Sequence, residues 1–225
     1  MSMSHQETIK CPECGKDSEF TVWQSINTTL DPEMKSAVRN KSAFQFICPY
    51  CGHKANVDYG FLYHQMEDHI MIHYANSEEN AQEIYKMLTE KDEANPMKDM
   101  LKDLITEKYL CRIVRSQNQL LEKLAIFDAQ MDDRIVEICK CLIYAQFLEK
   151  HPDSRDVELL MFTNEDKKHI VQIMNNEGSF GFAEISDDLY QSVKTHSEKD
   201  LTDLREDDPI IDRKWALTFM SRNHS

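Results

Sequence analysis

Two copies of the motif Cys-Pro-x-Cys-Gly limit what this chain can fold into more than any other feature of its sequence. They are Cys11-Pro12-Glu13-Cys14-Gly15 and Cys48-Pro49-Tyr50-Cys51-Gly52. The proline fixes a backbone dihedral and lacks an amide hydrogen, and the glycine can adopt the left-handed conformation, which leaves its amide free to donate to sulfur. Each motif is predicted to form a tight turn, called a knuckle below, that directs two thiolates toward one metal ion.

Together the knuckles supply the four ligands of a tetrahedral site. Cys11, Cys14, Cys48 and Cys51 are predicted to hold one Zn²⁺, with bonds of about 2.3 Å. Strands predicted at residues 19–24 and 43–47 would bring the second knuckle onto the first, as in a zinc ribbon. Four thiolates fill the coordination shell and leave no position for water or substrate, so we expect a structural rather than a catalytic zinc ion.

Two other chemistries remain open for these cysteines. Doubled CPxCG knuckles also suit iron in a rubredoxin-like site, although the long polar insert at 27–42 does not favour that compact module. Cys48-Pro49-Tyr50-Cys51 is also the active-site tetrapeptide of glutaredoxins. Dithiol chemistry requires a helix that begins at the first cysteine, and residues 52–56 are a poor helix start.

Charge and motif content argue against several functions. The chain has 225 residues and a formal net charge of −14, so it lacks the basic composition typical of nonspecific nucleic-acid or anionic-membrane binding. Within residues 1–75 the balance is 6 Lys and Arg minus 9 Asp and Glu, or −3, so nucleic-acid recognition by the ribbon is not expected. The sequence contains no GxGxxG, GxxxxGK or GxSxG motif.

Cysteine usage and hydropathy predict the compartment. Seven cysteines are an odd number, and four of them fall in CxxC pairs, which suits a metal site in a reducing cytoplasm better than a disulfide framework. The N-terminal ten residues are polar and do not resemble a signal peptide. The most apolar stretch, residues 138–148, is too short and too polar to span a bilayer. We expect a cytoplasmic protein.

Hydrophobic periodicity predicts an α+β fold in which a zinc ribbon precedes a helix-rich region with a late β-hairpin. The composition divides the chain into residues 1–75 (zinc ribbon), 76–96 (helical connector) and 97–225 (α+β region). Beyond the ribbon, helices are predicted at 97–105, 120–127, 135–147, 189–194 and 212–220, and strands at 109–114, 157–162, 170–174 and 180–185. Asp132 or Asp133 is expected to cap the helix at 135–147.

With both knuckles identified, residues 1–75 resemble the CpXC domain, a bacterial and archaeal zinc-ribbon family named after its two CPxC motifs. Outside the cysteines, the resemblance includes segments 20–23, 25–27, 31–33 and 62–64, with Phe46 and Met66. A looser resemblance through residues 112–134 matches the region that follows the domain in longer members. The resemblance implies that the four cysteines are metal ligands, and it implies no biochemical activity.

Acids and histidines offer two further candidate sites. Asp128, Asp132, Asp133 and Glu137 cluster between two predicted helices, where they could hold Mg²⁺ but are explained more simply by helix capping. His64, His69 and His73 lie close together without an HExxH motif, and we expect them to be ordinary polar positions.

These observations favour a non-enzymatic zinc protein whose partner is another protein, with homodimerisation left open. An enzyme that uses the acids or histidines is the alternative.

Overall fold

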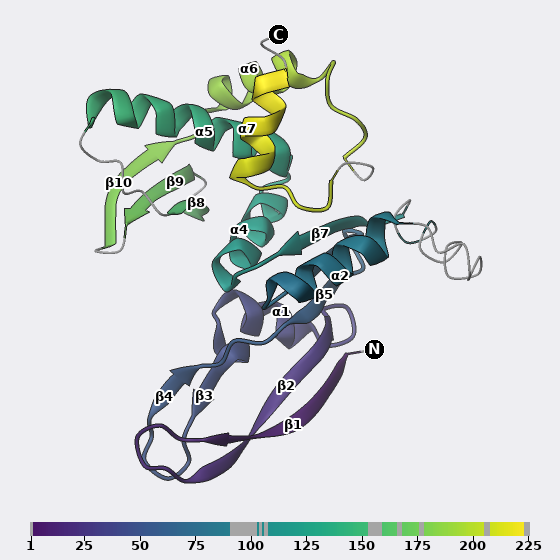
Figure 1. Cartoon of the computed structure of the whole chain (residues 1–225), viewed down its shortest axis with the longest axis vertical. Helices are drawn as coiled ribbons and strands as arrows, with labels where there is room; N and C mark the ends of the chain where they lie inside the picture. Colours follow the sequence, from purple (N-terminus) through teal and green to yellow (C-terminus); the bar gives the residue numbers. More distant parts are fainter. Residues whose placement is uncertain are drawn as a thin grey trace. The chain divides into compact units, whose positions relative to one another are not determined.

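The computed structural model describes residues 2–90, 103, 105, 108–152, 159–165, 168–175, 178–204 and 208–222 (Figure 1). The fold is α+β, which confirms the predicted class. The chain forms two compact units, Met1–Gln117 and Asn118–Ser225. The division into residues 1–75, 76–96 and 97–225 was drawn from composition, and it stays a prediction.

The first unit is built on a five-stranded sheet with the strand order β1-β2-β5-β6-β7. The strands are β1 (Met3–Lys10), β2 (Asp17–Asn27), β5 (Phe61–Gln65), β6 (Ile70–Tyr74) and β7 (Leu110–Val114). β1 pairs antiparallel with β2 and β5 antiparallel with β6, whereas β2–β5 and β6–β7 are parallel pairs. The strand predicted at 109–114 therefore belongs to the sheet of the first unit.

Strict alternation of buried and half-buried residues in β5 and β6 makes one face of this sheet a core. Aromatic rings continue that core toward the knuckles: Phe61 packs against Tyr74 and Phe44 with ring centroids 6.0 and 5.6 Å apart. Helices α1 (Pro32–Arg39) and α2 (Glu78–Thr89) also belong to this unit. α2 lies within the helical connector predicted at residues 76–96, and the Ser77 side chain caps it by accepting from the Asn80 amide.

A separate two-stranded sheet joins β3 (Gln45–Ile47) and β4 (Lys54–Asn56). The strand predicted at 43–47 is correct only from Gln45, because Ser42–Phe44 form a 3₁₀ turn, η1. β3 pairs with β4 and not with β2. Each knuckle therefore closes its own hairpin, and strand pairing does not join one knuckle to the other.

The second unit contains helices and a three-stranded sheet of order β10-β9-β8. Its elements are α4 (Gln117–Asp128), α5 (Asp133–Lys150), β8 (Leu159–Glu165), β9 (Lys168–Asn175), β10 (Gly178–Glu184), α6 (Asp187–Ser197) and α7 (Arg213–Arg222). β9 and β10 are antiparallel, which confirms the predicted late hairpin. Val136, Cys139, Phe162 and Val171 lie in its buried apolar core.

Some sequence-based predictions fall on residues without a description. Most of the helix predicted at 97–105, the first residues of the strand at 157–162 and the hairpin turn at 176–177 lie outside the described residues. In the part of the chain that is described, we find no helix with the length and apolar character needed to cross a membrane.

Candidate metal centre

The two knuckles have the same local structure, one between β1 and β2 and the other between β3 and β4. In the first, the Gly15 amide donates to the Cys11 carbonyl and the Cys11 amide donates to the Lys16 carbonyl, each at 2.9 Å. The second repeats both bonds, from Gly52 to Cys48 and from Cys48 to His53, again at 2.9 Å. The two CPxCG motifs therefore fold as one repeated unit, as their sequence predicts.

Glycine is required at the end of each knuckle because the backbone turns left-handed there. Gly15 has φ = 69° and Gly52 has φ = 73°. One detail of the prediction is wrong, since these glycine amides donate to carbonyl oxygens and not to sulfur. The Cys48 sulfur accepts instead from the amides of Tyr50 and Cys51. The glycine amide closes the turn, and amides inside the turn solvate the sulfur.

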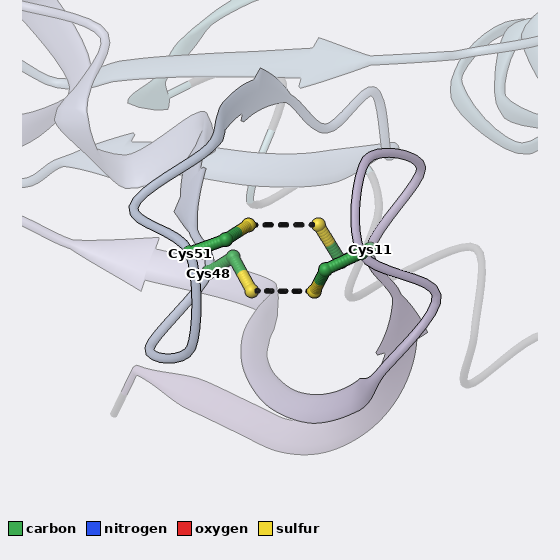
Figure 2. A group of neighbouring side chains, drawn as sticks. Cys11, Cys48 and Cys51 are labelled. Atoms are coloured by element: carbon green, nitrogen blue, oxygen red, sulfur yellow. Dashed lines mark hydrogen bonds between the residues drawn. The ribbon is translucent and has the colours of Figure 1, made fainter.

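The four thiols converge on one point between the hairpins. Figure 2 shows Cys11 projecting from one loop toward Cys48 and Cys51 on the other. The Sγ atoms of Cys11 and Cys51 are 3.7 Å apart, and those of Cys14 and Cys48 are 3.6 Å apart. All four sulfur atoms lie within 4.8 Å of one another. In a tetrahedron with metal–sulfur bonds of about 2.3 Å, neighbouring sulfurs are about 3.8 Å apart. The spacing therefore fits one tetrahedral metal ion.

Burial is shared unequally within each knuckle. The first cysteines, Cys11 and Cys48, are each 1% exposed, whereas Cys14 and Cys51 are exposed. Cys11 and Cys48 form a small apolar cluster with Phe46, against which Ile9, Phe20, Ala55 and Val57 pack. A further contact crosses between the hairpins, because the Lys16 ammonium lies 4.6 Å from the centroid of the Tyr50 ring. Apolar side chains thus cover the inner side of the site, and the exposed Cys14 and Cys51 form its outer side.

The surroundings of the second knuckle shift the pKa values of its two thiols in opposite directions. Burial raises the pKa of Cys48, but hydrogen bonds from the amides of Tyr50 and Cys51 outweigh it and lower the pKa to about 6. The amide of His53 lowers the pKa of Cys51, but burial and the three neighbouring sulfurs outweigh it and raise the pKa to about 12. The shared hydrogen bonds among the sulfurs therefore favour the thiolate at Cys48 and the thiol at Cys51. Thiolate ligands favour zinc or iron over magnesium or calcium.

A glutaredoxin-like dithiol site needs a helix that begins at its first cysteine. The residues after Cys51 form strand β4 instead, as their poor helix-start sequence predicts. The Cys48 sulfur also faces Cys14 on the other hairpin. The structural requirement for a lowered-pKa helix-capping cysteine is therefore absent from this knuckle.

The acids between α4 and α5 are engaged with cations. Asp133 pairs with Lys123 at 2.7 Å, Asp132 pairs with Arg134 at 2.8 Å, and Glu137 accepts from Lys140 at 2.9 Å. Asp132 also caps α5 by accepting from the Arg134 amide, as predicted. Asp128 is exposed. Over the residues described, the cysteine group alone has the spacing to hold a metal ion. The structure does not bring the four acids together as one ligand set.

The histidines occupy a strand, a turn and a second strand. His64 lies in β5, His73 in β6, and His69 between them with φ = 53°. The rings of His64 and His69 pack against the Tyr109 ring with centroids 5.0 and 5.4 Å apart. The interval from His69 to His73 is therefore not helical. Burial lowers the pKa of both His64 and His73, the latter to about 4.

Sequence reasoning missed the basic partners of the acids. Glu122 and Lys140 form a buried pair at 2.7 Å, and Glu122 also accepts from the Phe162 amide at 2.6 Å. The only signal was the appearance of charged residues among the apolar positions of α4 and α5. Periodicity treats each charge as solvent-facing, so it gave no reason to place them inside.

Two facing CPxCG knuckles on separate hairpins, with four thiols at tetrahedral spacing, define a four-cysteine type of metal-site protein. The model of the CpXC protein family matches residues 9–140, and the chain belongs to this family. The match begins just before the first knuckle and ends within α5. Searches among curated proteins and among solved structures gave no match.

Proposed function

We propose that this chain is a zinc-binding interaction protein in which Cys11, Cys14, Cys48 and Cys51 hold one structural Zn²⁺. The convergence of four thiols from two hairpins carries the proposal. Zinc is preferred to iron because the segment between the hairpins contains η1 and α1, so the site is not a minimal rubredoxin-like module. A filled shell of four thiolates leaves no open position for catalysis.

The proposed role of the metal is to join the hairpins. β3 and β4 are only three residues long each, and the cluster beneath the knuckles has three fully buried members, Cys11, Phe46 and Cys48. So small a core gives too little burial to fix two separate hairpins, and structural zinc commonly supplies that stabilisation in small folds.

A groove next to the second knuckle supports the interaction role. It has a volume of about 380 Å³ and lies between β2 and the segment from α1 to β3. Its lining includes Trp23, Met34, Phe46 and Ile47, with Glu19 as an acidic member. Ile47 is 51% exposed, so its side chain is accessible from the groove. Thr21 and Ser42 add hydroxyl groups to the lining, so we infer a protein partner that contacts the groove through both apolar and polar side chains.

Net charge and cysteine usage support the proposed class of partner and the proposed compartment. A net charge of −14 opposes nucleic acid and anionic membranes as partners. All seven cysteines are free, which supports a reducing compartment such as the cytoplasm.

Metal analysis of protein purified without added metal tests the central claim. We expect about one zinc per chain and a colourless solution. Cys51→Ser should lose that zinc, and Cys141→Ser, which changes a buried cysteine of the second unit, should keep it. Iron at the same stoichiometry with a red colour would replace the proposal with electron transfer, and free thiols without metal would restore the dithiol hypothesis.

The groove is tested separately with three baits: the native chain, Ile47→Asp and Leu217→Asp. Leu217 lies on α7 in the second unit and is also 51% exposed, so the two variants alter equally exposed side chains. A partner that uses the groove should be retained by the native chain and Leu217→Asp and lost from Ile47→Asp. Equal retention by all three would remove the groove from the proposal.

A further inference from the structure

Strand β1 leaves one edge of the sheet unpaired. It is the first strand in the order β1-β2-β5-β6-β7, and within the first unit no described strand pairs with its outer side (Figure 1). Its register with β2 is regular over seven successive pairs, from Ser4–Trp23 to Lys10–Asp17. An edge of this length offers a row of backbone amides and carbonyls to any incoming strand.

Few of the usual protections against strand addition are present on β1. Every side chain from Met3 to Thr8 is exposed, and Ile9 is half-buried. The strand contains no proline and no glycine. Its one register shift lies at Met3/Ser4, outside the regular part, and its one lysine is the last residue, Lys10. The stretch from Ser4 to Ile9 is therefore an extended edge without proline, glycine, a register shift or lysine, and Glu7 is its one acidic side chain.

The sequence of β1 is complementary to itself in one antiparallel register. When a second copy is laid against the edge with a two-fold axis at Gln6, the opposed pairs are Met3–Ile9, Ser4–Thr8, His5–Glu7 and Gln6–Gln6. Apolar residues meet apolar residues, hydroxyls meet hydroxyls, and an imidazole meets a carboxylate. Cross-strand pairs of these kinds stabilise antiparallel sheets.

Neighbouring registers lose this match. An axis at Glu7 places Glu7 against the partner's Glu7, and an axis at His5 places His5 against the partner's His5. An axis between Gln6 and Glu7 is excluded, because it would oppose residues that project from opposite faces of the strand, such as Met3 and the partner's Lys10. Directly opposed carboxylates destabilise a pair of strands, and directly opposed imidazoles lose their carboxylate partners. The side chains therefore select the axis at Gln6.

The His5–Glu7 pair is already oriented within one chain. His5 Nε2 lies 3.0 Å from Glu7 Oε1, and both side chains project from the same face because they are two residues apart on a strand. With the axis at Gln6, His5 lies beside its own Glu7 and opposite the partner's Glu7. The two strands then form a cluster of four side chains in which every neighbour carries the opposite type of group.

We propose that two copies of this chain associate by antiparallel pairing of their β1 strands about an axis at Gln6, which joins two five-stranded sheets into one. This association depends neither on the metal nor on the groove of the proposed function. The occupant of the edge is a second copy because the complementarity is between β1 and itself.

Sedimentation velocity of the full chain, up to about 1 mM, measures the association. The native chain should show a reversible monomer–dimer equilibrium. His5→Glu sets two carboxylates opposite each other, and Glu7→Lys replaces the carboxylate opposite each imidazole with an ammonium group. Because of the two-fold axis, each substitution acts twice, so each should raise the dissociation constant on the order of tenfold.

The double variant His5→Glu with Glu7→Lys identifies the register. With the axis at Gln6 it restores opposite charges across the strands and should recover the native dissociation constant. With an axis at His5 or at Glu7 it would instead place like charges together. Glu67→Lys makes the same charge change in the exposed turn between β5 and β6, and it should leave the association unchanged.

Three results would overturn the proposal: a native chain that remains monomeric through about 1 mM, a dimer insensitive to both single substitutions, or a double variant as weak as the single ones. His5 and Glu7 are exposed and lie outside the cysteine group, so the metal content and circular dichroism of each variant should match the native chain. These controls separate a failed interface from a failed fold.

Discussion

Lys123 Nζ donates to Asp133 Oδ2 at 2.7 Å in an ion pair whose side chains are 4% and 0% exposed. The pair links α4 to α5, and Lys123 also approaches Glu137 at 3.9 Å. Lys140 forms a second bridge between these helices, donating to Glu122 and Glu137. Burial removes these five charges from water, so their mutual hydrogen bonds must replace hydration.

This buried pair predicts a strong asymmetry between single and double substitutions. Asp133→Leu leaves the Lys123 ammonium buried without this carboxylate and should lower the free energy of unfolding by about 3–5 kcal/mol. Lys123→Met with Asp133→Leu removes both charges and should recover most of that loss, as judged by urea unfolding. Asp200→Asn, an exposed control, should change stability by less than about 0.5 kcal/mol. Equal losses in the single and double variants would contradict the argument.

Chelation of the metal should loosen the first unit selectively. The knuckle hairpins have few buried side chains besides the cysteines, whereas the second unit has a large apolar core of its own. On addition of a chelator we expect the amides of Phe46 and Ala55 to lose protection from hydrogen exchange, while those of Val171 and Ile173 keep it. Cys11→Ser should reproduce this effect, and Cys111→Ser, a buried cysteine of β7, should not. Simultaneous loss of protection in both units would argue against a local role for the metal.

The left-handed glycines should tolerate asparagine better than alanine. A Cβ at Gly52 meets no atom within 4 Å, so the penalty there is one of backbone conformation only. At φ = 73°, Gly52→Ala should cost about 1–2 kcal/mol, and Gly52→Asn should cost less because asparagine visits this conformation more readily. Thermal unfolding of the metal-loaded protein measures both. A larger loss for asparagine than for alanine would show that side-chain size, and not φ, decides this position.

Burial of His73 predicts a specific acid sensitivity. Burial lowers the pKa of His73 from 6.5 to about 4, so between these values the unfolded chain binds a proton that the folded protein excludes. The free energy of unfolding should therefore fall as pH is lowered through this interval, by up to about 1.4 kcal/mol per pH unit from this group.

Acid also protonates thiolates, so the effect of His73 is isolated by comparison with His73→Leu, which cannot protonate. The native chain should lose stability more steeply than His73→Leu between pH 6.5 and 4 and in parallel with it above pH 7. Identical pH profiles would mean that His73 protonates without unfolding the sheet. Denaturant titrations at each pH provide the measurement.

The sequence by itself determined the features that depend on residues close together in the chain. The CPxCG spacing predicted the knuckles, because the turn is closed by bonds such as that from the Gly15 amide to the Cys11 carbonyl. Asp132 or Asp133 was expected to cap α5, and the carboxylate of Asp132 accepts from the Arg134 amide two residues away. The hydrophobic period predicted α4 and α5 for the same reason, since it reports which side of a local element is apolar.

Only the tertiary structure decided which distant residues meet. β7 pairs in parallel with β6, and Glu122 accepts from both Lys140 and the Phe162 amide, 18 and 40 residues away. The acids around Asp133 look like a candidate magnesium site in sequence because a one-dimensional pattern shows their negative charges without their cationic partners. Folding placed lysine ammonium groups against them, since a buried carboxylate is tolerated only where a donor replaces the water it loses.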